Sequence, residues 1–196
     1  SLAIRSSYTV VLVLAACVAS LLFAGYLARW VLAKDEGSAD MTEVSDAIRE
    51  GADGFFATQY GLIGKLAGVL AIIIYLIYSA RALTKEQEDA GLTRQTFAWL
   101  TTFSFLLGAA CSGASGYVGM WVSVRANVRV AGAARRSARE ALQVALRAGG
   151  FAAIVVVAMT VLGVSVLFTV FSYIFDVGRP GGMDVHELPL MLVGYG

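Results

Sequence analysis

Two residue types on which enzyme sites often depend are scarce in this sequence. It has one histidine, His186, and two cysteines, Cys17 and Cys111. A single histidine with no cysteine near it makes a poor zinc site, and two cysteines set in apolar stretches favour buried thiols over a disulfide. Charged residues are also few, at 15% of the chain. Because soluble domains carry about 25% charged residues, the composition indicates a membrane protein.

Long intervals without any charged residue are the main feature of the sequence. They cover residues 6–28, 66–80, 95–124 and 148–175. A helix needs about 20 mostly apolar residues to cross a hydrocarbon core of about 30 Å. We therefore predict an all-α integral membrane fold, with Trp30 and Lys34 as interfacial anchors of the first span. The predicted spans are 6–33, 55–80, 95–124, 148–175 and the start of a fifth span at 188–196.

The stretch before the second span has the pattern of an amphipathic helix. Its apolar residues fall at spacings of three and four, from Met41 to Phe55. Asp40, with Glu43 three residues later, is suited to cap the start of this helix. Acidic residues form a stripe on another face, namely Glu43, Asp46, Glu50 and Asp53. Such a stripe could bind cations or a partner, but a solvated helix face is the interpretation we adopt. We expect the helix to continue directly into the second span.

A strongly basic segment separates the third and fourth spans. Its arginines are Arg125, Arg129, Arg135, Arg136, Arg139 and Arg147. Glu140 is the only acidic residue among them. Short connections rich in lysine and arginine stay on the cytoplasmic side. With this connection inside, ten lysines and arginines lie on the inner side and five on the outer side. We therefore predict an N-terminus that is outside or lumenal, and cytoplasmic connections at 34–54 and 125–147.

Small residues recur at helical spacing in two of the spans. They are Gly61, Gly64 and Gly68 in the second span and Gly108, Ser112 and Gly116 in the third. Small side chains let two helices approach closely in lipid, where no hydrophobic force drives helices together. We expect the row from Gly108 to Gly116 to pack against another helix of the same subunit.

The residues needed for catalysis are not apparent in this sequence. We find no combination of serine, histidine and aspartate, no cysteine cluster and no acidic residue inside the predicted spans. A proton relay through these spans would need ionisable side chains of that kind. We therefore predict no catalytic, substrate-binding or metal-binding residue in this chain.

Two long motifs nevertheless resemble one known family. MTEVSDAIREGADGFFATQY (41–60) is similar to the N-terminal cytoplasmic motif of membrane-bound proton-pumping inorganic pyrophosphatases. LLGAACSGASGYVGMWVSVRANVRVAGAARRSAREAL (106–142) resembles the third and fourth helices of that family with their connection. WVLAKDEG (30–37) and LPLMLVGYG (188–196) are similar to its potassium-independent, plant-type branch.

The resemblance implies that residues 1–196 are an N-terminal fragment of a much larger proton-translocating inorganic diphosphatase, usually a homodimer. In that family, magnesium pyrophosphate is hydrolysed at the cytoplasmic end of an inner ring of helices that begins with the fifth. Protons are delivered to the outer or lumenal side. The residues that bind Mg²⁺ and pyrophosphate and those that carry the proton would lie beyond Gly196. This chain would then supply outer scaffold helices, and we expect it to be inactive alone.

A different class of protein remains open from the residues themselves. The chain could be a self-contained four-helix membrane protein for packing or for interaction with anionic lipid, without enzymatic activity. In either case we expect membrane lipid, and no nucleic acid, as a partner. For the pump we expect a Golgi-type or vacuole-type membrane in a plant or alga and the plasma membrane in a bacterium.

Overall fold

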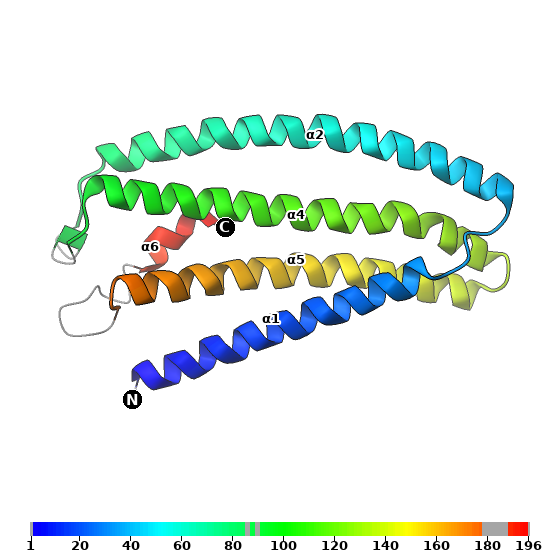
Figure 1. Cartoon of the computed structure of the whole chain (residues 1–196), viewed down its shortest axis with the longest axis horizontal. Helices are drawn as coiled ribbons and strands as arrows, with labels where there is room; N and C mark the ends of the chain where they lie inside the picture. Colours follow the sequence, from blue (N-terminus) through cyan, green and yellow to red (C-terminus); the bar gives the residue numbers. More distant parts are fainter. Residues whose placement is uncertain (1, 85–86, 89–90, 178–187, 196) are drawn as a thin grey trace. The chain divides into compact units, whose positions relative to one another are not determined.

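The computed structural model of this chain describes residues 2–84, 87–88, 91–177 and 188–195 and contains no strand among them. Its elements are α1 (Leu2–Leu32), α2 (Ala39–Ala80), α4 (Arg94–Ala134), α5 (Ala138–Ile174), α6 (Leu188–Leu192) and the 3₁₀ helix η1 (Val193–Tyr195) (Figure 1). The four long helices are each long and apolar enough to cross a membrane. The predicted all-α membrane fold is therefore confirmed. Lys85, Arg179 and His186 lie outside the described residues.

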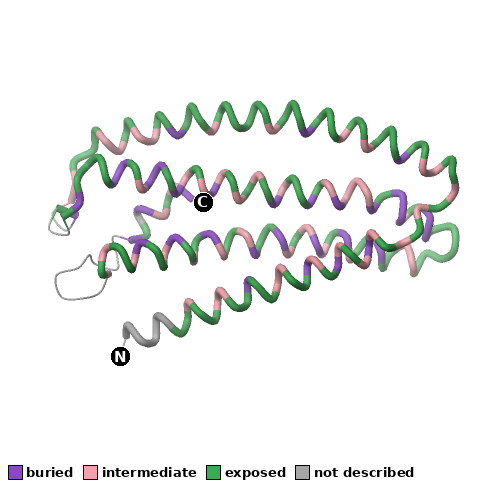
Figure 2. Tube along the Cα trace, in the orientation of Figure 1, coloured by how far each residue is buried: buried purple, intermediate pink, exposed green. Residues whose placement is uncertain are grey.

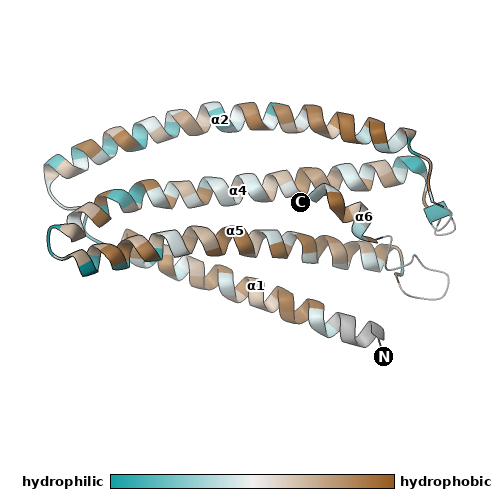
Figure 3. Cartoon of the chain, turned by 180° about the vertical axis from the view of Figure 1, so that it is seen from behind, coloured by the Kyte–Doolittle hydropathy of each residue, from teal (hydrophilic) through white to brown (hydrophobic). Residues whose placement is uncertain are grey.

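α2 is one continuous helix that joins the amphipathic stretch to the second predicted span, as expected from the sequence. Hydrophilic residues are concentrated in its first half and hydrophobic residues in its second half (Figure 3). The helix begins at Ala39, so the predicted cap at Asp40 is wrong. The carbonyl of Ser38 accepts hydrogen bonds from Thr42 N at 3.1 Å and Thr42 Oγ1 at 3.2 Å. Asp40 instead lies in the first turn, where its negative charge interacts favourably with the positive end of the helix dipole.

The basic segment is mostly helical, which corrects the prediction of a connection spanning 125–147. α4 continues past residue 124 to Ala134, and α5 begins at Ala138. The connection itself is the short turn at 135–137. The physical reason is that alanine and arginine both have high helix propensity, and no proline interrupts this stretch. Ser137 starts α5, because its Oγ accepts a hydrogen bond from Glu140 N at 3.1 Å.

The chain divides into two compact units, and each of the four long helices contributes to both. The first unit comprises Ser1–Ala16, Ile63–Cys111 and Thr160–Gly196. Its buried core is formed by Leu92, Phe97, Leu167, Phe171, Leu188, Met191 and Tyr195. Gly108 packs against the backbone of Tyr195, and a Cβ at Gly108 would overlap that backbone. The contact predicted for Gly108 is thus made by η1 and not by a long helix.

The second unit comprises Cys17–Leu62 and Ser112–Met159. Its apolar core joins α1, α4 and α5 and has two clusters of buried residues. One holds Ala24, Leu27, Val122, Phe151 and Val155, and the other holds Val31, Ala126, Ala133, Val144 and Ala148.

α2 contributes few buried residues and is exposed along most of its length (Figure 2). A Cβ at Gly61, Gly64 or Gly68 would meet no heavy atom within 4 Å. The close helix approach expected at this row is therefore not found within the described part of the chain.

Candidate functional site

The loop between α1 and α2, residues 33–38, lies directly on α4 at Gly132. A Cβ at Gly132 would meet Gly37 N at 3.3 Å and Asp35 O at 3.4 Å, so glycine permits this close approach. Gly37 has a φ of 91°, and its N–H donates to Asp35 Oδ1 at 3.2 Å. The left-handed conformation favours glycine at this position. This contact brings the carboxylates of residues 35 and 36 beside the arginines of α4 and the following turn.

Arg129 of α4 binds the C-terminal end of α1. Its Nε donates to the carbonyl oxygens of Leu32 and Lys34, each at 3.1 Å. The last carbonyl groups of a helix have no partner inside the helix. A positive charge there also meets the negative end of the helix dipole favourably. Arg129, although charged, is buried, and its guanidinium therefore acts as a cap for α1.

Glu36 joins three segments of the chain through two arginines. Its Oε1 accepts a hydrogen bond from Arg49 Nη2 of α2 at 2.7 Å and forms an ion pair with Arg129 Nη2 of α4 at 2.9 Å. The hydrogen bond from Arg49 and the positive charges of both arginines hold the pKa of Glu36 below its usual value of 4.5, and they outweigh the effect of partial burial. Arg49 also pairs with Asp46 at 3.0 Å. The loop, α2 and α4 are thus connected by ion pairs that share one carboxylate.

A second set of ion pairs connects the same loop to the turn between α4 and α5. Arg136 binds both carboxylate oxygens of Glu140, with Nε–Oε2 at 3.0 Å and Nη2–Oε1 at 2.9 Å. Its Nη1 donates to Asp35 Oδ2 at 3.2 Å. This cluster is exposed to solvent, where single ion pairs stabilise a protein by about 0–1 kcal/mol. We therefore assign more of the stabilisation to the buried Arg129.

Acidification should weaken this site through Glu36. A group whose pKa is lowered by folding stabilises the protein fully above its unfolded pKa, and this contribution is lost as the pH falls through the folded value. We expect the thermal unfolding midpoint of the detergent-solubilised protein to fall below about pH 4.5. The Glu36→Gln variant should have a lower unfolding midpoint than wild type at neutral pH, and its midpoint should fall less steeply as the pH is lowered. Glu50→Gln, a change at an exposed position of α2, should follow the wild-type curve. A Glu36→Gln curve parallel to wild type would contradict this assignment.

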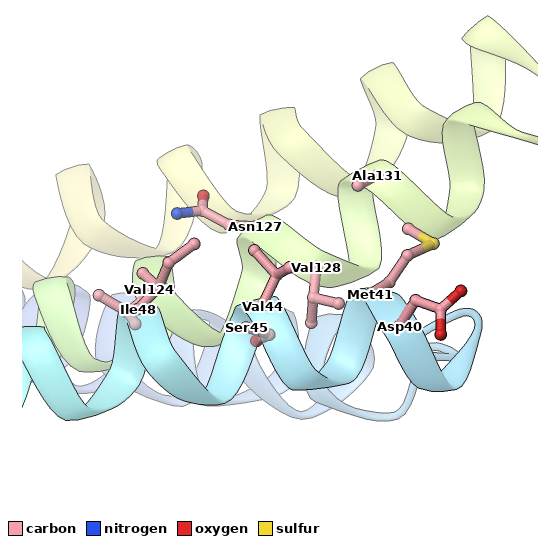
Figure 4. Close-up of a pocket in the computed structure, with 9 residues that line it drawn as sticks. All are labelled: Asp40, Met41, Val44, Ser45, Ile48, Val124, Asn127, Val128 and Ala131. Atoms are coloured by element: carbon pink, nitrogen blue, oxygen red, sulfur yellow. The ribbon is translucent and has the colours of Figure 1, made fainter.

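An apolar groove lies between the first turns of α2 and the last turns of α4. Its volume is about 400 Å³, and it is lined by Asp40, Met41, Val44, Ser45, Ile48, Val124, Asn127, Val128 and Ala131. Figure 4 shows Asp40 at one end of the groove, with Ile48 and Val124 at the other. Val44 and Ile48 are 62% and 48% exposed. The groove offers apolar surface but no set of polar groups suited to chemistry.

Farther along the same two helices, an aromatic cluster packs against the small residues of α4. The ring of Tyr60 on α2 lies 5.9 Å from the ring of Tyr117 and 6.1 Å from that of Phe56. A Cβ at Gly116 would meet Tyr60 Oη at 3.1 Å, and one at Gly113 would meet Tyr60 Cε1 at 3.7 Å. The expected packing of Gly116 against another helix is therefore confirmed, and α2 is that helix.

The site fits a structural role better than a catalytic one. The carboxylates of Asp35, Glu36 and Glu140 each bind arginine. Among the residues that the structure describes, no group of three or more histidine, cysteine, aspartate or glutamate side chains could hold a metal ion. Cys17 and Cys111 are free thiols. Sequence reasoning missed Asp35, Glu36 and Arg49. The signal available was the acidic pair next to the predicted end of the first span.

Comparison with known proteins places the chain in a family. The sequence model of the family described as inorganic H+ pyrophosphatase matches residues 18–196. This chain belongs to that family. The resemblance carried by residues 41–60 and 106–142 is thereby confirmed.

The relatives of this pyrophosphatase-family chain are longer than the chain itself. A protein of Arabidopsis thaliana named "Pyrophosphate-energized membrane proton pump 3" is 58% identical over 192 residues, which are 98% of this chain and 24% of that protein. A "K(+)-insensitive pyrophosphate-energized proton pump" of Caldanaerobacter subterraneus subsp. tengcongensis is 36% identical over 91% of this chain and 24% of its own length. A second such pump, from Moorella thermoacetica, is 37% identical over 91% of this chain and 22% of its own length. The chain thus spans about a quarter of the length of these relatives. No solved structure gives a significant match.

Proposed function

We propose that this chain is the N-terminal membrane part of a pump that couples hydrolysis of inorganic pyrophosphate to proton translocation. The observation that carries the proposal is the 58% identity to a pyrophosphate-energized proton pump across 98% of the chain. Within such a pump, the four long helices serve as supporting helices. The ion pairs of Glu36, Arg129 and Arg136 hold their ends together on one side of the membrane.

In this proposal, pyrophosphate and Mg²⁺ bind outside residues 1–196. Mg²⁺ takes oxygen ligands, often carboxylates, but the carboxylates that converge in this chain already bind arginine. The described residues therefore do not fit a magnesium site. We further propose that the complete pump is a homodimer. We propose that the pump lies in a Golgi-type or vacuole-type membrane in a plant or alga and in the plasma membrane in a bacterium.

A chimaera tests the proposed function. The corresponding N-terminal quarter of the Arabidopsis relative is replaced by residues 1–196, and pyrophosphate-driven acidification is measured in membrane vesicles. We expect the chimaera to pump, because the two sequences are 58% identical over this part. Residues 1–196 alone should release no phosphate from magnesium pyrophosphate. A folded chimaera that neither hydrolyses nor pumps would contradict the proposal. It would leave the self-contained membrane protein as the better explanation.

We also propose that the ion-paired ends of the helices face the cytoplasm. The support is the excess of lysine and arginine on that side, ten against five. Single cysteines at the exposed positions Ser137 and Glu88, in a background without native cysteines, should react with an impermeant thiol reagent from opposite sides of the membrane. Reaction of both from the same side would contradict this topology.

A further inference from the structure

Two cationic side chains of the second unit converge on one aromatic ring. The Lys34 ammonium lies 4.2 Å from the centroid of the Trp30 ring, and the Arg147 guanidinium carbon lies 3.6 Å from it. Lys34 follows α1, and Arg147 lies on α5. The two positive charges are therefore separated by no more than the sum of these distances, and each is partly exposed. Like charges this close repel each other, and an anion bound near both would offset that repulsion.

The neighbouring carboxylates make their direct ion pairs with a different arginine. Asp35 and Glu140 are the closest acidic residues in sequence to Lys34 and Arg147, and both bind Arg136, at 3.2 and 2.9 Å. Within the described part of the chain, the ion pairs are made by Arg49, Arg129 and Arg136. The charge of Lys34 acts on Glu140 at longer range and contributes to the lowered pKa of that carboxyl, but neither Lys34 nor Arg147 makes an ion pair in this part of the chain. Their ammonium and guanidinium groups remain available to an external oxyanion.

An exposed apolar strip continues from Trp30 along α1. Tyr26, Phe23 and Leu22 stand four, seven and eight residues before Trp30, which places them on the same helix face. They are 61%, 53% and 72% exposed, and the rings of Phe23 and Tyr26 stack at 6.3 Å. Tryptophan is enriched where a membrane helix meets the headgroup layer. The cations and the strip thus offer a polar end and an apolar end to one ligand.

We propose that Lys34, Arg147 and Trp30 form a binding site for an anionic phospholipid. Its phosphate group would be bound between Lys34 and Arg147, and an acyl chain would lie along Tyr26, Phe23 and Leu22. Basic pockets between membrane helices recognise anionic headgroups through this charge complementarity. Free phosphate or pyrophosphate presents the same oxyanion but has no acyl chain, so the apolar strip favours the lipid. The site adjoins the ion pairs of Glu36, because Arg129 binds the carbonyl oxygen of Lys34, and it does not depend on the proposed pump activity.

Native mass spectrometry of the full chain in detergent tests the site. The protein is titrated with dioleoylphosphatidylglycerol, with dioleoylphosphatidylcholine, or with sodium phosphate or pyrophosphate. We expect a preference for the phosphatidylglycerol. Lys34→Gln and Arg147→Gln should each weaken its binding about fivefold, because one lysine or arginine near a membrane surface contributes about 1 kcal/mol. The double variant should weaken it about 25-fold if the two contributions add. Arg139→Gln, which removes an exposed arginine of α5, is the matched control.

Three outcomes would overturn the proposal. Equal binding of the two lipids by the wild-type protein would show that the headgroup charge is not recognised, and this comparison needs no variant. Equal affinities of Arg139→Gln and the double variant would show that the charge is recognised elsewhere. Competition of free phosphate or pyrophosphate with phosphatidylglycerol at matched concentration would make the ligand a soluble anion. Circular dichroism of each variant confirms that it is folded.

Discussion

Replacing Arg129 with alanine should lower the free energy of unfolding by about 3 kcal/mol, the largest effect we expect from a single substitution. Breaking a buried ion pair typically costs about 3–5 kcal/mol, and Glu36 keeps Arg49 as a partner. The substitution removes the ion pair to Glu36 and the hydrogen bonds to the carbonyls of Leu32 and Lys34. Unfolding in mixed micelles, titrated with a denaturing detergent, measures the change.

The controls for Arg129 separate loss of charge from loss of geometry. Arg129→Lys keeps the charge, but an ammonium group cannot donate hydrogen bonds from one planar group as a guanidinium does. We therefore expect Arg129→Lys to retain less than half of the free energy of unfolding that Arg129→Ala loses. Arg135→Gln removes an exposed arginine of the same segment and should change the free energy by less than about 0.5 kcal/mol. Equal effects at Arg129 and Arg135 would mean that overall positive charge, and not the cap on α1, stabilises this end.

Gly116→Leu should lower the free energy of unfolding by about 1–3 kcal/mol through overpacking. The added side chain would start 3.1 Å from Tyr60 Oη. The side chain of Tyr60 cannot easily move away, because its ring packs against the rings of Phe56 and Tyr117. The same mixed-micelle titration measures this effect.

Gly61→Leu is the matched control for Gly116→Leu. Both substitutions replace a helical glycine in the second unit, so their gain in helix propensity is the same. A Cβ at Gly61 meets no atom within 4 Å, and lipid tails are as apolar as leucine. We expect no loss of stability at Gly61. Equal losses at the two positions would mean that the side chain of Tyr60 is not a fixed neighbour of α4.

The helices could be predicted from the sequence because lipid imposes a simple rule. Every backbone polar group in the hydrocarbon layer must be hydrogen-bonded within the chain, so a long charge-free run is a helix. The continuous α2 followed from the apolar spacing between Met41 and Phe55, which leads directly into the second span. The start of α2 was misplaced because Asp40 and Glu43 match a capping pattern, although Ser38 precedes the helix. Local signals of this kind fix a helix boundary only to within one or two residues.

The ion-paired site could not be predicted, because its partners are far apart in sequence. Residues 125–147 look like an exposed loop, in which arginines would face water. In the structure α4 remains helical through Arg129 and is packed against the α1–α2 loop at Gly132. Only this packing buries Arg129 and brings it to Glu36. The glycine rows show the same limit, since a Cβ at Gly116 would meet Tyr60 of α2, whereas a Cβ at Gly61 would meet no atom of another described element within 4 Å.

The cap on α1 also has a consequence for the order of events during biosynthesis. Glu36 leaves the ribosome long before Arg129, because 92 residues separate them in the sequence. At about 5–20 residues per second, this delay is roughly 5–20 seconds. During that time α1 is already made, while the carbonyls of Leu32 and Lys34 still lack their guanidinium partner. The C-terminal end of α1 therefore stays without its arginine cap until α4 has been made.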